Sequence, residues 1–127
     1  MDTTPKVTLA AMNMEAADPV RLAEFWAGAV GGVLSPGPEG CMILNSDAPG
    51  GLPMFFQPLG EGRPERQIHH LDLTVPWGTR ESEVQRIVGL GAERKWDVLD
   101  EVPWIQWTTL TDPEGNLFCL GEHPPAG

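Results

Sequence analysis

Residues 68–75, IHHLDLTV, place a histidine and a carboxylate two positions apart in a stretch typical of a β-strand. Successive strand side chains point to opposite faces, so His70 and Asp72 share one face while Leu71 and Leu73 share the other. Histidine titrates near ~6.5, so His70 suits either proton transfer as a general base or the anchoring of a substrate. The alternative is a histidine that is simply hydrogen-bonded in a polar pocket. Because two strand positions are about 6–7 Å apart, a direct hydrogen bond to Asp72 is not expected.

A second polar face is predicted in residues 6–16, KVTLAAMNMEA, which alternate as a strand does. Asn13 and Glu15 lie on one face, and Met12 and Met14 lie on the other, which we expect to pack under a helix. If the polar face lines the same cavity as the histidine of the later strand, Glu15 can orient that imidazole or carry a proton itself.

The aromatic residues are dominated by tryptophan, with five tryptophans and no tyrosine. Trp26 falls on the apolar stripe of a predicted helix and is expected in the core. Trp104 and Trp107 fall in a predicted strand but differ in parity, so only one of them can face a cavity. An aromatic wall of this kind would stack on a planar apolar ligand and contribute ~0.5–1.5 kcal/mol beyond burial. The alternative is that these side chains fill the core or a dimer interface.

The two cysteines, Cys41 and Cys119, lie in apolar strand-like runs without an export signal, so we expect free, buried thiols. Cys119 has no obvious activating base near it in the sequence, and no G-x-S-x-G serine motif occurs. The glycine-rich pieces lack the spacing that cradles phosphates and are interpreted as turns. His123, in the proline-rich tail, is expected to be merely exposed.

Two amphipathic helices are predicted. For the first, Asp18 is a suitable N-cap, Pro19 suits the first helical position, and residues 31–32, Gly-Gly, end it. Its apolar stripe comprises Leu22, Phe25, Trp26, Ala29 and Val30. The second helix is expected to start near Thr79, with acidic residues in its first turn where the helix dipole favours them. Its buried stripe comprises Val84, Ile87 and Val88.

The remaining apolar runs predict strands near residues 33–34, 41–44 and 52–57 after the first helix, and near residues 93–98, 104–111 and 117–121 after the second. The chain is therefore strand, helix, three strands, written twice, and both helices finish in glycine-rich ends. Two such units can place their sheets side by side, with the helices covering the outer face and the polar strand faces lining a trough.

The charge distribution excludes several partners. With 8 basic and 18 acidic residues the formal net charge is −10, and the sequence pI is about 4.5, which repels nucleic-acid phosphates and anionic lipids. No stretch approaches the ~20 apolar residues of a membrane span, and no signal peptide is recognised. We therefore expect a cytoplasmic protein with neither nucleic-acid nor membrane partners. Abundant Ala, Gly and Pro, with Arg exceeding Lys, suggest a bacterial source.

Four segments carry a family resemblance: DPVRLAEFWAGAVGG, HLDLTV, LGAERKWD and WTTLTDPEGNLFCL. Together they resemble the glyoxalase-like members of the vicinal oxygen chelate superfamily, which includes glyoxalase I, bleomycin-resistance proteins and extradiol dioxygenases. The resemblance implies an α+β fold with two βαβββ modules that form a U-shaped mixed sheet around a cavity, helices on the outer face. It implies a single domain of residues 1–127, with module one at about 5–60 and module two at about 66–122. It also implies a homodimer and a small molecule in the trough.

Metal-dependent relatives hold a divalent ion with four side chains, one from the first and one from the last strand of each module. The positions that match here are Ala11, Gln57, His70 and Cys119. Ala11 has no donor atom, Gln57 offers a neutral amide, and Cys119 stands where these relatives usually have glutamate. The resemblance therefore implies a degenerate site and a protein with neither a metal nor another cofactor. A zinc ion held by histidine, glutamine and cysteine is the alternative.

These observations predict a metal-free small-molecule-binding protein of the glyoxalase and bleomycin-resistance type that holds an apolar or aromatic compound. The expected ligand contacts are Asn13, Glu15, Gln57, His70, Asp72, Trp104, Trp107 and Cys119. The alternative is a lyase, isomerase or dioxygenase of the same superfamily, either metal-dependent or using His70 or Glu15 as the catalytic residue for proton transfer. A third interpretation is a dimeric protein that serves only as an interaction surface.

Overall fold

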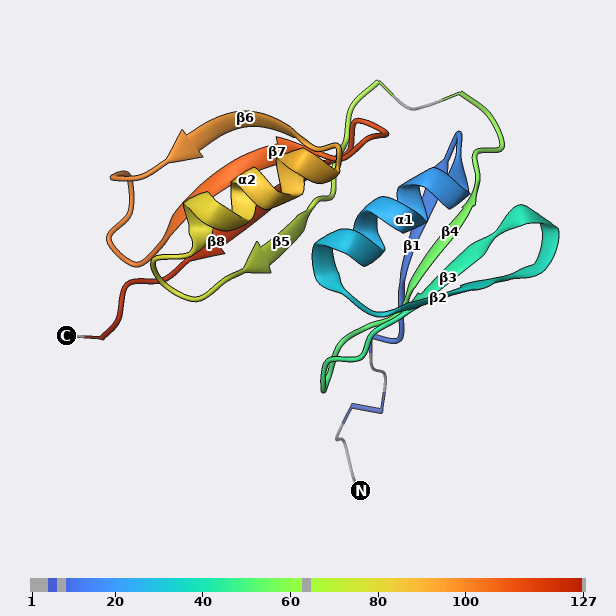
Figure 1. Cartoon of the computed structure of the whole chain (residues 1–127), viewed down its shortest axis with the longest axis horizontal. Helices are drawn as coiled ribbons and strands as arrows, with labels where there is room; N and C mark the ends of the chain where they lie inside the picture. The colour runs from blue at the N-terminus through green and yellow to red at the C-terminus, as the bar shows by residue number, and fades with distance from the viewer. Residues whose placement is uncertain (1–4, 7–8, 63–64, 127) are drawn as a thin grey trace. The chain divides into compact units, whose positions relative to one another are not determined.

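The computed structural model describes residues 5–6, 9–62 and 65–126, and the chain divides into two compact units, residues 1–60 and 61–127. Each unit runs strand, helix, three strands (Figure 1). Unit one contains β1 (Met12–Ala16), α1 (Pro19–Val30), β2 (Val33–Pro36), a 3₁₀ turn (Pro38–Gly40), β3 (Met42–Asn45) and β4 (Met54–Pro58). Unit two contains β5 (Leu71–Thr74), α2 (Arg80–Leu90), β6 (Glu93–Val98), β7 (Gln106–Thr111) and β8 (Leu117–Glu122). The predicted α+β class with two βαβββ modules is confirmed.

The sheet of unit one has the strand order β1-β4-β3-β2, in which β1 is parallel to β4 and the other pairs are antiparallel. Helix α1 packs on β3 and β4. Ala16, Leu44 and Phe56 are each at most 1% exposed and form the core beneath the helix. Because strand side chains alternate, the neighbours of these residues make up the opposite face.

Helix α1 begins and ends where the sequence predicts. The Asp18 carboxylate accepts a hydrogen bond from the Arg21 amide at 3.1 Å, and Gly31 is the C-cap. Leu22, Ala23, Phe25 and Trp26 are buried, and the rings of Phe25 and Trp26 meet edge to face at 5.3 Å. The predicted stripe is wrong at its last position: Val30 is exposed, because it lies in the final turn beyond the buried residues. Met12 is also exposed, so it does not pack under this helix as predicted.

The sheet of unit two repeats the pattern with the order β5-β8-β7-β6, and β5 is parallel to β8. Parallel neighbours need a long crossover connection, which the helix and two antiparallel strands of each unit supply. The core beneath α2 consists of Val84, Ile87, Leu110, Phe118 and Leu120. The same strand order in both units supports the internal repeat that the sequence indicates.

The first strand of each unit is shorter than predicted. In the first, residues 9–11 are not strand and β1 starts at Met12, where pairing with Met54 begins; residues 7–8 lie outside the described residues. In the second, β5 starts at Leu71, opposite Phe118, so His70 precedes the strand. Alternation of side chains marks where a strand is allowed, whereas its length is set by the partner strand that supplies hydrogen bonds.

The N-terminus of α2 is stabilised by a residue from the far end of the chain. Thr79 is the N-cap, but its hydroxyl donates to the Pro76 carbonyl; the Glu122 carboxylate instead accepts from the Gly78 and Arg80 amides at 2.8 and 3.1 Å. The Arg80 side chain is buried and its Nη1 donates to Thr108 Oγ1 at 2.5 Å, with Nε 3.4 Å from Glu122 Oε1. The predicted buried stripe of α2 is therefore wrong at Val88, which is exposed. Arg80, which was not predicted to be buried, lies on the buried side of the helix instead.

An ion-pair network also ties α2 to β6. Arg94 donates to both carboxylate oxygens of Glu81, at 2.7 and 2.8 Å, and also to Asp97 at 2.9 Å. The hydrogen bonds from Arg94 are the main reason why the pKa of Glu81 falls from 4.5 to about 2. Glu81 is well exposed, so solvent screens much of this interaction.

Removing the Glu81 charge is expected to have its full effect above the unfolded pKa of 4.5 and to lose that effect as the pH falls to about 2. A carboxyl group with a lowered folded pKa stabilises the fold above its unfolded pKa, and this contribution is lost as the pH falls through the folded pKa. In urea unfolding, Glu81→Gln is expected to be up to about 1 kcal/mol less stable than the unmodified chain at pH 7. The difference should shrink between pH 4.5 and about 2, the span of the pKa shift. A difference of the same size at pH 2 would contradict the assignment.

Among the described residues, 5–6, 9–62 and 65–126, no helix has the length and apolar character needed to cross a membrane.

Candidate functional site

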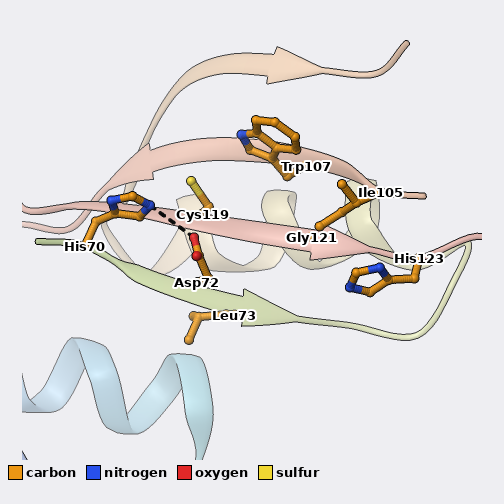
Figure 2. A pocket seen from close by; sticks show the side chains of 8 residues that line it. All are labelled: His70, Asp72, Leu73, Ile105, Trp107, Cys119, Gly121 and His123. Carbon is orange, nitrogen blue, oxygen red and sulfur yellow. Dashed lines mark ion pairs between the residues drawn. The ribbon is translucent and has the colours of Figure 1, made fainter. Parts of the chain in front are cut away.

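His70, Asp72 and Cys119 converge on one face of the unit-two sheet (Figure 2). Strand β5 carries Asp72, and the adjacent parallel strand β8 carries Cys119, its register partner. His70 lies immediately before β5, with its Nε2 atom 3.1 Å from Asp72 Oδ1. One ligand-type atom of each of the three residues lies within 4.8 Å of the others. The structure therefore joins residues that are about fifty positions apart in the chain.

The direct contact between His70 and Asp72 corrects the prediction that they are too far apart to hydrogen-bond. The expected spacing applies to the backbone of a regular strand, but side chains lean along the strand direction. His70 is also outside β5, so its backbone is free of the strand geometry and the ring turns toward the carboxylate. The pair has the geometry of a histidine oriented by a carboxylate.

Cys119 is a half-buried free thiol whose Sγ lies 3.3 Å from Thr109 Oγ1. Burial is the main cause that raises the pKa of Cys119, the nearby Asp72 carboxylate raises it further, and the hydrogen bond with Thr109 opposes them. The group is therefore a protonated thiol at neutral pH rather than a thiolate. Since the thiolate is the nucleophile, the raised pKa makes Cys119 less reactive than an ordinary thiol. Cys41 is likewise free and half-buried, so the two free thiols are confirmed but full burial is not.

These three residues form one end of a pocket of about 460 Å³. Trp107 and Ile105 provide its aromatic and aliphatic wall (Figure 2). A Cβ atom added at Gly121 would lie 3.0 Å from Ile105 Cδ1, so the glycine leaves room beside that side chain. The described residues that line the pocket are His70, Asp72, Leu73, Ile105, Trp107, Cys119, Gly121 and His123.

His123 is a pocket residue that the sequence interpretation missed. It is exposed as predicted, but it lines the pocket and its Nδ1 lies 2.9 Å from the Trp104 carbonyl oxygen. The signal that could have found it is the two-residue period of the last strand, which puts Cys119, Gly121 and His123 on one side. The strand direction simply continues past the end of β8.

The two tryptophans predicted to contact ligand differ in position. Trp107 lies within β7 and lines the pocket. Trp104 precedes β7 and is 64% exposed, and its carbonyl oxygen lies against the pocket residue His123. The predicted strand started too early, because β7 begins only at Gln106, opposite Glu122. Contact of the Trp104 ring with a ligand remains a prediction.

The other predicted contacts belong to unit one. Glu15 on β1 is the register partner of Gln57 on β4, and Asn13 is the partner of Phe55, so the three polar residues share the face opposite the buried Phe56. Ala11 lies just before β1. These residues form a polar group of their own on the sheet of unit one, and their contact with a ligand remains a prediction.

A family model of the glyoxalase-like domain matches residues 11–121, which span both units and every pocket residue except His123. The chain belongs to this family. None of the curated proteins is similar to it at a significant level.

Solved structures of this glyoxalase-like fold resemble the chain over nearly its whole length. A glyoxalase/bleomycin resistance protein/dioxygenase family enzyme from Burkholderia phytofirmans PsJN has a TM-score of 0.77 at 16% identity, covering 93% of this chain and 100% of that one. A glyoxalase/bleomycin resistance protein/dioxygenase from Nocardioides has a TM-score of 0.75 at 16% identity, covering 98% and 89%. The fosfomycin resistance protein FosX from Listeria monocytogenes, complexed with Mn(II) and sulfate, has a TM-score of 0.74 at 15% identity, covering 95% and 93%.

The donor set of this glyoxalase-like domain does not fit an ion like the Mn(II) of that FosX structure. Mn(II) prefers carboxylate, carbonyl and water oxygens. Here Cys119 offers sulfur rather than oxygen, Ala11 has no donor atom, and Gln57 offers a neutral amide. Zinc accepts histidine, carboxylate and thiolate, so His70, Asp72 and Cys119 are the residues that would hold it, after loss of the thiol proton.

Proposed function

We propose that this glyoxalase-like protein binds a small apolar or aromatic compound in the pocket of unit two and holds it without a catalytic metal. The observation that carries the proposal is the pocket itself, in which the Trp107 and Ile105 wall adjoins a polar end formed by His70, Asp72 and Cys119. Such pockets, apolar with a few convergent polar groups, are typical of small-molecule sites. Sequestration of a toxic compound is one use of such a protein.

Saturable binding of an aromatic probe tests this function. In isothermal titration calorimetry with 2-naphthol, we expect binding at one site per chain, followed by recovery of the probe chemically unchanged by chromatography and mass spectrometry. Quenching of tryptophan fluorescence should follow the same isotherm, because Trp107 lines the pocket. Absence of saturable binding would contradict the proposal.

The metal-free state is supported by the missing donor at Ala11 and by the sulfur of Cys119, which stands where metal-dependent relatives usually have glutamate. Metal analysis of protein purified without chelator is expected to find far less than one divalent ion per chain. A stoichiometric ion that is lost in His70→Ala, and retained in a matched His69→Ala variant, would show a metal site and overturn this part of the proposal.

An enzyme is the second candidate function, and the 3.1 Å contact between His70 and Asp72 favours it. A histidine oriented by a carboxylate is suited to proton transfer in a lyase, isomerase or dioxygenase of the superfamily, and Glu15 of unit one is the alternative proton-transfer residue. Recovery of a transformed compound whose formation is lost in His70→Ala would favour catalysis over binding.

We further propose that the chain is a cytoplasmic bacterial protein, a single domain over residues 1–127, that acts as a homodimer with no macromolecular partner besides its own copy. The net charge of −10 supports the exclusion of nucleic acids and anionic membranes. Gel filtration with light scattering is expected to give twice the chain mass of 13.8 kDa.

A further inference from the structure

Among the described residues that line the pocket of unit two, the one Asp, Glu, Lys or Arg side chain is an aspartate. Of the described residues that line it, Asp72 is a carboxylate, His70 and His123 are histidines, and the others are uncharged. Neither lysine nor arginine is among them. With the histidines neutral, as in the count that gives the chain a net charge of −10 at pH 7, the lining carries one net negative charge.

The Asp72 carboxylate is available to a ligand. Its side chain is 78% exposed, and His70 Nε2 lies against one of its oxygens at 3.1 Å. An ionised carboxylate has about four lone-pair sites, so further donors can be accommodated.

An aromatic wall accompanies this charge. Trp107 lines the same pocket, and the face of an indole attracts cations as well as planar apolar groups. The acidic chain as a whole also concentrates cations near its surface and disfavours anions. The charge of Asp72 and the ring of Trp107 thus both favour a ligand that is a cation, and the ring also favours a planar apolar group in it.

We propose that the pocket takes an aromatic compound that carries a protonated amine, with Asp72 receiving the ammonium group and Trp107 the aromatic ring. This inference rests on the proposed function and adds the class of ligand to it. Anionic aromatic compounds are expected to be rejected, because they would meet the carboxylate with neither lysine nor arginine among the described lining residues to compensate.

A charge series on one ring system tests the proposal. The probes are 1-naphthylmethylamine, 1-naphthylmethanol and 1-naphthaleneacetic acid, titrated calorimetrically at pH 7.5 and low salt. The amine is expected to bind about fivefold more tightly than the alcohol, the upper end for a solvent-exposed ion pair, and the acid more weakly than the alcohol. Added salt should reduce the advantage of the amine and leave the alcohol unaffected.

Matched variants locate the effect. Asp72→Asn is expected to remove the advantage of the amine. The alcohol should still bind within about twofold of its original affinity, which shows that the pocket is intact in the variant. Asp100→Asn removes the same charge from an exposed aspartate outside the pocket lining and is expected to keep the preference.

The possible results separate the ligand class, the binding function and the role of Asp72. Equal or tighter binding of the alcohol or the acid would overturn the amine class but leave the proposed binding function standing. Failure of all three probes to bind would overturn both. Loss of the preference in Asp100→Asn as much as in Asp72→Asn would show that the overall charge, rather than the pocket carboxylate, selects the ligand, and would overturn the assignment to Asp72.

Discussion

Replacing Arg80 with methionine is expected to lower the free energy of unfolding by about 3–5 kcal/mol, the cost of leaving a buried charge unpaired. The Arg80 side chain is 10% exposed and that of Glu122 is 7% exposed, and Arg80 Nε lies 3.4 Å from Glu122 Oε1. Methionine fills a similar volume but leaves the buried carboxylate with the backbone amides of Gly78 and Arg80 as its donors among the described residues. Urea unfolding followed by circular dichroism measures the change.

Arg86→Met is the matched control, because Arg86 lies on the same helix but pairs with Glu83 in solvent at 2.8 Å. An exposed pair of this kind contributes about 0.2–1 kcal/mol. Equal losses of stability in the two variants would contradict the buried role of Arg80. The ion pair is also next to the pocket in the chain, because Glu122 lies between Gly121 and His123, two of the residues that line it.

Replacing Trp107 with alanine is expected to weaken binding of an aromatic compound by about 2 kcal/mol, or roughly thirtyfold. The indole supplies the aromatic wall of the pocket, so the variant loses both apolar contact area and ring stacking. Calorimetric titration with 2-naphthol measures the change directly. Because Trp107 is half-buried, the fold itself is checked in parallel by its circular dichroism spectrum and melting temperature.

Trp96→Ala is the matched control for this experiment. Trp96 lies on β6 of the same sheet, is 53% exposed, and does not belong to the pocket lining. It is expected to bind 2-naphthol as the unmodified chain does. Unchanged affinity in Trp107→Ala, or equal loss in both variants, would place the ligand outside this pocket.

The helices were well predicted because their signals are local. Asp18, Pro19 and Gly31 mark the ends of α1 through backbone chemistry within a few residues, and Leu22, Phe25 and Trp26 mark its buried side. The positions of the strands were also predictable from alternation and from the turns between them. Their lengths were not, as at Met12 and Leu71, because a strand extends only as far as its partner.

The candidate site was predicted in part. The sequence pointed to His70, Asp72, Trp107 and Cys119, all of which line the pocket. It missed His123, which the two-residue period beyond β8 brings to the same side, and it missed the contact between His70 and Asp72. The buried Arg80 gave no signal, because an arginine at a helix start is usually exposed and its partners Thr108 and Glu122 come much later in the chain.

The sequence by itself determined the repeated strand–helix–three-strand order, because this order depends on periodicity, caps and turns within a short window, and it supplied the residue types that could do chemistry. The tertiary structure alone decided that β5 lies beside β8, and therefore that Asp72 meets Cys119 and that Glu122 reaches the start of α2. Parallel pairing joins strands separated by a whole helix and two strands, and no local pattern specifies which residues will stand opposite one another.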